Sequence, residues 1–312
     1  MAPSLTGLWP PVATPYSTDG AIDLPRQVAH SKQLLADGAH GLAVLGTTSE
    51  ANAQTLDERR RVIDAHVDAG IAPAQLMPGT GACALGDAIA LSRHAGEIGA
   101  AAVLLLPPFY YKNVSDDGLF AFVARLIEGC GAHAPRIMLY HIPPVAMVGW
   151  SAALIGRLRD AFPEIVVGMK DSSGDATNTL AMIESFPGFA VFPGAEVYLV
   201  AALRAGAAGC ISATANINAA GIRRLYDRWQ APEAEALQAE VNAVRKAVEG
   251  RGTIPALKAV LAERYGDPAW LGLRPPLMAI AEDKRAELLA DPAIVALLGA
   301  ATASLAGSSP RY

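Results

Sequence analysis

Short apolar segments alternate with longer amphipathic segments over the first two thirds of the chain. Each apolar segment is bounded by Gly, Pro or Asp and is too short for a buried helix, which is typical of strands buried on both faces. Eight such segments are present, at residues 8–14, 41–46, 75–80, 101–107, 136–142, 165–171, 190–195 and 209–213. The apolar spacing between them predicts helices at residues 24–37, 56–69, 86–97, 115–129, 151–160, 175–186 and 197–205.

Capping residues mark the start of two of these helices. Thr55 and Glu58 have the spacing of a capping box, and Ser115 precedes a pair of aspartates. Strands that alternate with helices predict a parallel sheet with both faces covered. Eight such units indicate an α/β fold, the closed (β/α)8 TIM barrel, which typically takes ~250 residues.

A doubly wound open sheet is the alternative fold. That fold normally carries the motif G-x-G-x-x-G directly after its first strand. Here the nearest candidate, Gly79-Thr80-Gly81, follows the third strand, and Ala84 stands in place of the last glycine. The barrel is therefore favoured.

No strand is predicted beyond about Asn218. The remaining pattern indicates helices at residues 219–250, 254–265 and 275–289, and a loose tail at residues 307–312. We therefore expect a barrel domain with the active site over residues 1–225 and a C-terminal helical region over residues 226–312.

Composition excludes several classes of protein. The chain has 312 residues, of which 52% are hydrophobic, and its formal net charge is −5 at pH 7. A mild negative charge disfavours nucleic-acid binding, which needs a basic face. The mean hydropathy is +0.28, but the most apolar stretch, residues 98–111, holds only 14 residues and two prolines. A membrane-spanning helix needs about 20 apolar residues, so we expect no membrane partner.

The beginning of the chain and its cysteines point to the cytoplasm. Residues 1–20 show neither the basic region nor the apolar region of a secretory signal. The three cysteines, Cys83, Cys130 and Cys210, are scattered in apolar neighbourhoods. We interpret them as buried free thiols in a reducing compartment.

Lys170 is a candidate nucleophile, because active sites in such barrels lie at the carboxyl ends of the strands. It follows the apolar run at residues 165–169, whereas the other five lysines, Lys258 among them, lie in polar or helical contexts where they reach water. A buried lysine loses its charge readily, and Schiff-base catalysis needs a neutral amine. The alternative is a lysine that extends to water or pairs with Asp171.

Two further features lie at strand ends. Tyr140 follows an apolar run, where its phenol is placed to carry protons beside Lys170. A core tyrosine with a hydrogen-bonded hydroxyl is the alternative. After the second strand, Gly46-Thr47-Thr48-Ser49-Glu50 offers N–H and hydroxyl donors to a carboxylate. Alternatively, this loop only caps the next helix.

Motifs for metal binding and for serine hydrolases are not visible. The six histidines form no H-x-H or H-x-x-x-H pair, and the three cysteines form no C-x-x-C. The nucleophile-elbow motif G-x-S-x-G is also absent from the sequence. We therefore expect neither a metal ion nor another cofactor.

Taken together, these residues resemble the dihydrodipicolinate synthase / N-acetylneuraminate lyase family of class I, pyruvate-handling aldolases. The order and spacing of five motifs match over about residues 8–216. They are Gly46-Thr47-Thr48-Ser49-Glu50, Pro108-Phe109-Tyr110-Tyr111, Tyr140-His141-Ile142-Pro143, Gly168-Met169-Lys170-Asp171-Ser172, and Gly209-Cys210-Ile211-Ser212 with Asn216. Each motif alone is weakly specific, but five in order are specific.

The resemblance implies roles for the matched residues. Lys170 forms the imine with a 2-oxo acid, and Tyr140 shuttles protons at the reacting carbons. Thr48 links Tyr140 to a second tyrosine, which in the family comes from a neighbouring subunit. Tyr111 is the match to this second tyrosine, and Tyr110 is the alternative match. Further contacts to the substrate and its carboxylate are implied for Thr47, Thr48, Ser172, Glu196, Ile211 and Ser212. The family implies a homotetramer built as a dimer of dimers.

Departures from the family pattern concern the substrate. In dihydrodipicolinate synthases an arginine that grips a substrate carboxylate follows Y-N-V-P two residues later, and here Val145 stands there. An apolar side chain cannot replace a bidentate guanidinium. Sialic-acid lyases carry Asp-Glu after the seventh strand and a serine after the eighth, where this chain has Ala195-Glu196 and Ala213. His141 replaces the asparagine of the motif, with no consequence assigned.

We therefore expect a Schiff-base lyase that cleaves or forms a 4-hydroxy-2-oxo acid or a 2-oxo-3-deoxy sugar acid. Pyruvate is one half of this acid and an aldehyde is the other. Within the family, the alternatives are a dehydratase acting through the same imine and a dihydrodipicolinate (4-hydroxy-tetrahydrodipicolinate) synthase. Outside it, the alternative is a non-catalytic barrel that senses a 2-oxo acid. Lys170, Tyr140 and Thr48 argue against that, because a sensor has no need of a reactive amine.

Overall fold

The computed structural model describes the backbone of residues 5–307 and the side chains of residues 5–300. Its strands form two parallel groups, β1 with β6 and the four-stranded sheet β2-β3-β4-β5. The strands are β1 (Gly7–Leu8), β2 (Val103–Leu105), β3 (Ile137–His141), β4 (Val166–Asp171), β5 (Ala190–Pro193) and β6 (Gly209–Cys210).

Two of the eight predicted strands, residues 41–46 and 75–80, form single parallel bridges rather than ladders. Leu42 pairs with Leu76, and Gly79 pairs with Leu104. The first segment leaves the extended conformation at Leu45, whose φ is 62°. In the second segment a proline at position 78 supplies no N–H to a ladder. The prediction of full strands was therefore wrong at these two places.

Backbone hydrogen bonds nevertheless connect all eight segments into a ring. His40 N donates to Leu8 O over 2.9 Å, and Leu42 exchanges bonds with residues 75–77. Thr80 N donates to Leu104 O over 3.0 Å, and Ala208 N donates to Val191 O over 2.9 Å. Together with the two paired groups, these bonds close the barrel. The predicted TIM barrel is confirmed.

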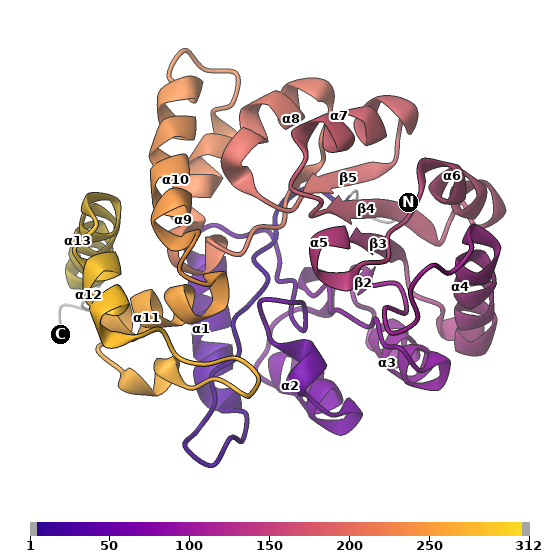
Figure 1. Cartoon of the computed structure of the whole chain (residues 1–312), viewed down its shortest axis with the longest axis horizontal. Helices are drawn as coiled ribbons and strands as arrows, with labels where there is room; N and C mark the ends of the chain where they lie inside the picture. Colours follow the sequence, from indigo (N-terminus) through magenta and orange to yellow (C-terminus); the bar gives the residue numbers. More distant parts are fainter. Residues whose placement is uncertain (1–4, 308–312) are drawn as a thin grey trace.

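Helices cover the outside of the barrel, as Figure 1 shows, while α10 to α13 lie on one side of it. The surrounding helices are α1 (Leu24–Ala36), α2 (Leu56–Asp68), α3 (Leu85–Glu97), α4 (Asp116–Cys130), α6 (Ala152–Ala161), α7 (Ala176–Ser185), α8 (Leu199–Ala205) and α9 (Ala215–Asp227). Shorter elements are α5 (Pro143–Ala146), η1 (Ala51–Ala53), η2 (Pro73–Gln75), η3 (Gly131–His133), η4 (Glu196–Tyr198) and η5 (Pro268–Leu271). The predicted capping box of α2 is formed by Thr55 and Glu58.

The C-terminal region differs from the sequence expectation. The helix predicted at residues 219–250 is broken after α9 and resumes as α10 (Ala234–Val248), with a proline at position 232 in the break. The helix α11 (Thr253–Tyr265) is as predicted. Of residues 275–289 only α12 (Glu282–Leu289) is helical, because two prolines begin this stretch.

The last helix, α13 (Pro292–Gly307), was not predicted. It begins directly after α12 and contacts α10, α11 and α12. After Gly307, the expected loose tail lies outside the described residues. The boundary expected at residue 225 falls within the last turn of α9, so the division into two domains stays a prediction.

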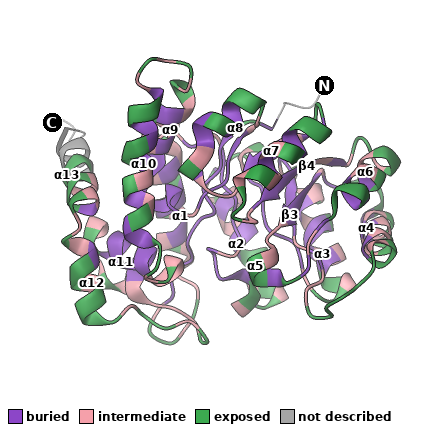
Figure 2. Ribbon diagram, turned by 45° about the horizontal axis from the view of Figure 1, so that its top comes forward, coloured by how far each residue is buried: buried purple, intermediate pink, exposed green. Residues whose placement is uncertain are grey.

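Apolar side chains fill the inside of the barrel, so its chemistry is confined to one end. Figure 2 shows the buried residues in the strands and on the inner faces of the helices. The inward-facing cluster includes Trp9, Ala43, Met77, Leu104, Met138, Phe192 and Ile211. Such a barrel is a packed core, and polar groups collect where the strands end.

Two of the three cysteines are buried as expected, but Cys83 is exposed. Cys83 lies in the loop before α3 rather than in a strand, so no layer of structure covers it. Among the described helices, none combines the length and apolar character that crossing a membrane requires.

Candidate active site

Lys170 and Tyr140 face each other at the carboxyl ends of two neighbouring strands. They are register partners in the parallel pair β3 and β4. The Nζ atom of Lys170 lies 4.2 Å from the centroid of the Tyr140 ring. Lys170 is 5% exposed and Tyr140 is 4% exposed. An amine in such a setting is shielded from bulk water while its end reaches the mouth of the barrel.

The hydroxyl of Tyr140 is bonded to Thr47. Thr47 Oγ1 and Tyr140 Oη are 3.0 Å apart. The resemblance assigned this link to Thr48, and the structure corrects that expectation. Adjacent side chains of the tight turn after Gly46 point in different directions, and only that of Thr47 reaches the phenol. Thr48 lies beside it and is buried, and its contact with a substrate carboxylate stays a prediction.

Bonds to the first strand segment and to Gln54, the residue that follows η1, fix the loop that carries Thr47. Ser49 Oγ donates to Val12 O, and Thr14 Oγ1 donates to Ser49 O over 2.8 Å. Gln54 Nε2 also donates to Ser49 O, over 2.7 Å. All three polar side chains are buried. Buried hydrogen-bond networks of this kind hold a backbone in one conformation.

Tyr110 and Tyr111 are exposed and pack against each other. They are 73% and 75% exposed, with ring centroids 5.2 Å apart in an edge-to-face arrangement. Val145 and Met147 are also mostly exposed, and Lys112 Nζ joins the two loops by donating to Ala146 O over 2.8 Å. Within one chain, neither tyrosine bonds to Tyr140 in the part that the structure describes.

Glu196 and Ser212 meet beneath α10. Glu196 accepts hydrogen bonds from Ser212 Oγ and Thr214 Oγ1, and all three side chains are fully buried. Arg245 Nη1 lies 3.8 Å from Glu196 Oε2, and Gln238 Nε2 donates to Glu196 O over 2.7 Å. These contacts tie α10 to the rim of the barrel. Sequence reasoning missed Thr214, although it stands two residues after Ser212 in the same motif.

The other predicted substrate contacts are Ser172, which follows Lys170 along the chain, and Ile211. Ser172 is half-buried, and its N–H donates to His141 O over 2.7 Å. Ile211 is buried in the cluster inside the barrel. Asp171 does not pair with Lys170, because its carboxylate accepts bonds from Thr179 Oγ1 at 2.6 Å and Asn178 Nδ2 at 2.9 Å. This removes the alternative in which Asp171 neutralises the lysine.

His141, which replaces the asparagine of the motif, is bonded through Nδ1. That atom accepts from Trp150 N over 3.0 Å. Burial lowers the pKa of His141, against a smaller opposing effect of Asp171. The imidazole is therefore neutral at neutral pH, with its proton on Nε2. It stabilises the turn into α6 rather than adding charge to the mouth.

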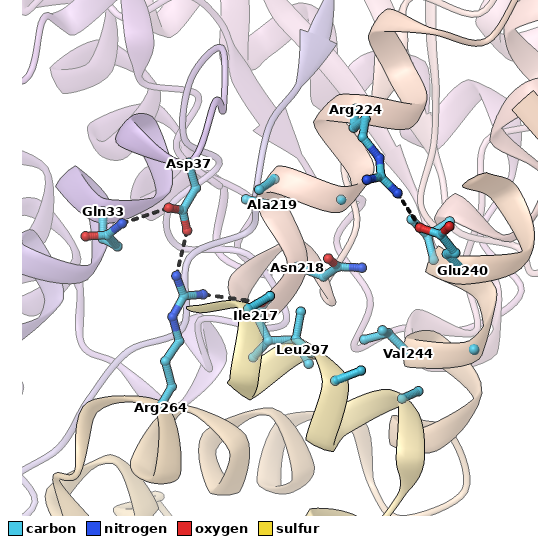
Figure 3. A pocket seen from close by; sticks show the side chains of 17 residues that line it. Gln33, Asp37, Ile217, Asn218, Ala219, Arg224, Glu240, Val244, Arg264 and Leu297 are labelled. Carbon is cyan, nitrogen blue, oxygen red and sulfur yellow. Dashed lines mark hydrogen bonds and ion pairs between the residues drawn. The ribbon is translucent and has the colours of Figure 1, made fainter. Parts of the chain in front are cut away.

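The larger of two cavities contains none of the predicted site residues, and two of them line the small one. One cavity of about 600 Å³ lies between α1, α9, α10, α11 and α13 (Figure 3). Ion pairs flank it, Arg264 with Asp37 and Arg224 with Glu240. A small cavity of about 20 Å³ adjoins Thr47 and Tyr140. Among the described residues, no group of three or more His, Cys, Asp or Glu side chains comes together as a metal site.

One lysine contradicts the sequence expectation. Lys258 was expected to reach water, but it is buried and paired with Glu50 at the end of the Thr47 loop. The signal in the sequence was the run of apolar neighbours on every side of it, at residues 256–262. A helix that is apolar all round is a buried helix.

A barrel that holds a buried lysine beside a tyrosine at its strand ends is typical of enzymes that act through an amine. The comparisons agree. The model of the dihydrodipicolinate synthetase family matches residues 4–293. The chain belongs to this family and is a lyase that forms a Schiff base.

Relatives and solved structures cover nearly the whole chain. An uncharacterized DapA-like lyase of Chloroflexus aurantiacus is 35% identical, over 91% of this chain and 95% of that protein. A 4-hydroxy-tetrahydrodipicolinate synthase of Acidiphilium cryptum is 30% identical, over 89% and 94%. The crystal structure of dihydrodipicolinate synthase from Agrobacterium tumefaciens has a TM-score of 0.86 at 34% identity, covering 94% of this chain and 99% of that one. N-acetylneuraminate lyase from Fusobacterium nucleatum shares the fold, with a TM-score of 0.81 at 22% identity. The match covers 91% of this chain and 96% of that one.

Proposed function

We propose that the enzyme cleaves or forms a 2-oxo acid of which pyruvate is one half and an aldehyde the other. The observation that carries the proposal is the contact of Lys170 with Tyr140 and of Tyr140 with Thr47. A nucleophilic amine and a proton carrier stand within reach of one substrate carbon. The 4-hydroxy-2-oxo acids and 2-oxo-3-deoxy sugar acids have a carbonyl and a hydroxyl at the spacing that this chemistry needs.

The first step joins the substrate to Lys170. The Nζ lone pair attacks the C2 carbonyl, and the carbonyl oxygen leaves as water after it has received two protons. A protonated imine remains, whose nitrogen is an electron sink. Nζ lies over the ring of Tyr140, and the hydroxyl of this tyrosine supplies and takes up protons at the C2 carbon.

The second step breaks the C3–C4 bond. A base removes the proton of the C4 hydroxyl, the aldehyde leaves, and the bonding electrons move through C3 and C2 onto the imine nitrogen. The resulting enamine takes a proton at C3, and water then releases pyruvate and restores the amine of Lys170. We assign both proton movements to Tyr140, with Thr47 as its hydrogen-bond partner at 3.0 Å.

The carboxylate of the 2-oxo acid would lie at the Thr47 loop. Thr47 and Thr48 follow a glycine in this turn and offer hydroxyl and N–H groups. Turns of this kind form concave sites for anions. Ser172 is the partly exposed polar residue next to Lys170 and Asp171. Glu196 and Ser212 support the rim from below, since both are fully buried and bonded to each other.

Val145 favours an aldehyde half that bears hydroxyls and no charge over aspartate semialdehyde. Its side chain is 63% exposed on α5, where the family's synthases carry a carboxylate-binding arginine. An apolar side chain at this rim cannot bind an anion. Hydroxyls of a sugar acid, in contrast, need only ordinary hydrogen bonds.

A second copy of the chain would complete the site. Tyr110, Tyr111, Val145 and Met147 expose a patch of apolar surface beside the barrel mouth. Tyrosine and methionine are enriched where proteins contact each other. We propose that this patch pairs with its equivalent, so that Tyr111 of one copy approaches Tyr140 of the other within a homotetramer.

We also place the enzyme in the cytoplasm. All three cysteines are free thiols in the structure. The exposed Cys83 would remain a thiol only where the surroundings are reducing.

Trapping with borohydride tests the proposed function. Hydride reduces the imine to a stable amine, so pyruvate should become attached at Lys170 and be found there by peptide mapping. Lys170→Ala should give neither an adduct nor turnover, while Lys246→Ala, at an exposed lysine of α10, should behave as wild type. An adduct at another lysine, or none, would overturn the proposal. A panel of 2-oxo-3-deoxy acids, assayed for released pyruvate, identifies the substrate; loss of water without pyruvate would reveal a dehydratase instead.

A further inference from the structure

Lys258 is a buried lysine that the proposed reaction does not use. It lies on α11, outside the barrel, among residues that are all buried from Ala256 to Ala262. Its side chain is 1% exposed. Lysine is almost never fully buried unless it is paired, so its partners indicate why it is retained there.

The partners of Lys258 connect α11 to the catalytic loop. Its Nζ donates to Glu50 Oε1 and, over 2.6 Å, to Gly272 O, and it lies 4.7 Å from the centroid of the Tyr16 ring. Burial lowers the pKa of Lys258, and Glu50 opposes that effect. The second oxygen of Glu50 accepts from Arg274 N over 3.2 Å. Both carboxylate oxygens of Glu50 are thus held by the C-terminal region.

Glu50 sits at a strained position of the loop. Its φ is 56°, in the left-handed region that residues other than glycine rarely adopt. Its N–H donates to Thr47 O over 3.0 Å, and Ala51 N donates to Gly46 O over 3.3 Å. The turn therefore closes around Thr47 and Thr48. Strained conformations persist only where the surroundings enforce them, so the contacts of the Glu50 carboxylate keep this turn together with the bonds of Ser49.

A continuous set of contacts then leads from α11 to the nucleophile. Glu50 is bonded to Lys258 on one side and to the backbone of Thr47 on the other. Thr47 is bonded to Tyr140, and the ring of Tyr140 lies under Nζ of Lys170. Every link is a described contact between buried or half-buried groups.

We propose that Lys258 is a positioning residue for the reaction. By holding Glu50, it sets Thr47 against Tyr140 and sets the Thr47–Thr48 turn against the carboxylate of the 2-oxo acid. This inference rests on the proposed function and adds to it, because it gives the C-terminal helices a part in binding pyruvate. The paired charges at the base of the loop define the geometry of a site that neither residue touches.

Three variants test this role. Lys258→Met keeps the length of the side chain but removes the donor, Glu50→Gln keeps an acceptor for Lys258, and Lys246→Met is the control at an exposed lysine. The rate of borohydride trapping is measured against pyruvate concentration, together with kcat, KM and Tm. Lys258→Met should raise the pyruvate concentration for half-maximal trapping about tenfold or more, since small misplacements are costly in such sites. The adduct should still map to Lys170. Glu50→Gln should also raise this concentration, because the amide keeps only one of the two acceptor oxygens that Glu50 offers to Lys258 and to Arg274 N.

A merely structural role gives a different result. Lys258→Met would then melt at a lower temperature, yet the folded enzyme would trap pyruvate with wild-type concentration dependence, which overturns the inference. Should Lys258→Met fail to fold, the double variant Lys258→Met with Glu50→Gln leaves no unpaired buried charge. Raised KM in the double variant supports the positioning role, and a wild-type KM refutes it. Failure of the proposed function is seen separately, as wild-type enzyme that forms no adduct at Lys170.

Discussion

The side-chain nitrogen of Lys170 lies 4.2 Å from the centre of the Tyr140 ring, because the two residues are register partners on adjacent parallel strands. Neighbouring strands place side chains of the same register on the same face. The proposed nucleophile and the proposed proton carrier are therefore brought together by the strand pairing and not by a flexible loop. The effect of a substitution at either residue therefore depends on the position of the other.

Tyr140→Phe should separate proton transfer from imine formation. The ring and its packing under Lys170 are kept, while the transferable proton is lost. General acid–base catalysis contributes about 10²–10⁴-fold, so kcat should fall by that factor. Trapping should be slower but should still reach Lys170 at long incubation. Stability should change by about 1 kcal/mol, from one lost hydrogen bond. A near-normal kcat with a lowered Tm would instead make Tyr140 a core residue.

Thr47→Val and Thr48→Val form a matched pair that tests which threonine serves the tyrosine. Thr47 Oγ1 is the atom 3.0 Å from Tyr140 Oη, so Thr47→Val should lower kcat. Thr48→Val should chiefly raise KM for pyruvate, because the interaction lost is with the bound carboxylate in ground state and transition state alike. Steady-state kinetics of both variants decide the matter. The opposite assignment of effects would restore Thr48 to the link.

Val145→Arg should improve a weak dihydrodipicolinate synthase activity. Wild type should use aspartate semialdehyde poorly beside its best sugar acid. Hydrogen bonds to charged groups contribute about 1.5–3 kcal/mol. The new guanidinium should thus raise kcat/KM for aspartate semialdehyde about ten- to hundred-fold. Val145→Leu, which adds volume without charge, is the control. A wild type that already uses aspartate semialdehyde as well as any sugar acid would contradict the reasoning.

His30 should make the protein less stable in acid. It is fully buried between Tyr265 and Asn216, and burial lowers its pKa to about 4. In the unfolded chain a histidine titrates near 6.5, so the unfolded state binds a proton first as the pH falls. The stabilisation is complete above about pH 6.5 and is lost towards pH 4, amounting to about 3 kcal/mol.

Unfolding by urea at several pH values measures this effect. His30→Gln should flatten the fall in unfolding free energy between pH 7 and pH 4, whereas His133→Gln, at an exposed histidine, should leave it unchanged. Equal pH dependence in all three proteins would show that His30 is not the titrating group. Activity is measured in parallel, since Asn216 also bonds the end of the first barrel strand.

The pattern of the sequence was sufficient for the barrel and for the place of Lys170 and Tyr140 in it. Buried parallel strands show as short apolar runs, and the period of the helices between them is equally local, so both can be predicted along the chain. Lys170 and Tyr140 stand at the ends of two such runs, and all parallel strands end at one rim. Their meeting follows from the order of the strands.

Only the tertiary structure decided which polar groups complete the site. Thr47 rather than Thr48 reaches Tyr140 because of how one tight turn closes, and no periodicity describes a turn. Glu196 and Ser212 are buried against α10, a contact between segments far apart in the chain. Lys258 is 208 residues from Glu50, and their pairing depends on where α11 docks. Side-chain direction and long-range docking are fixed by packing, which the local pattern of residues does not contain.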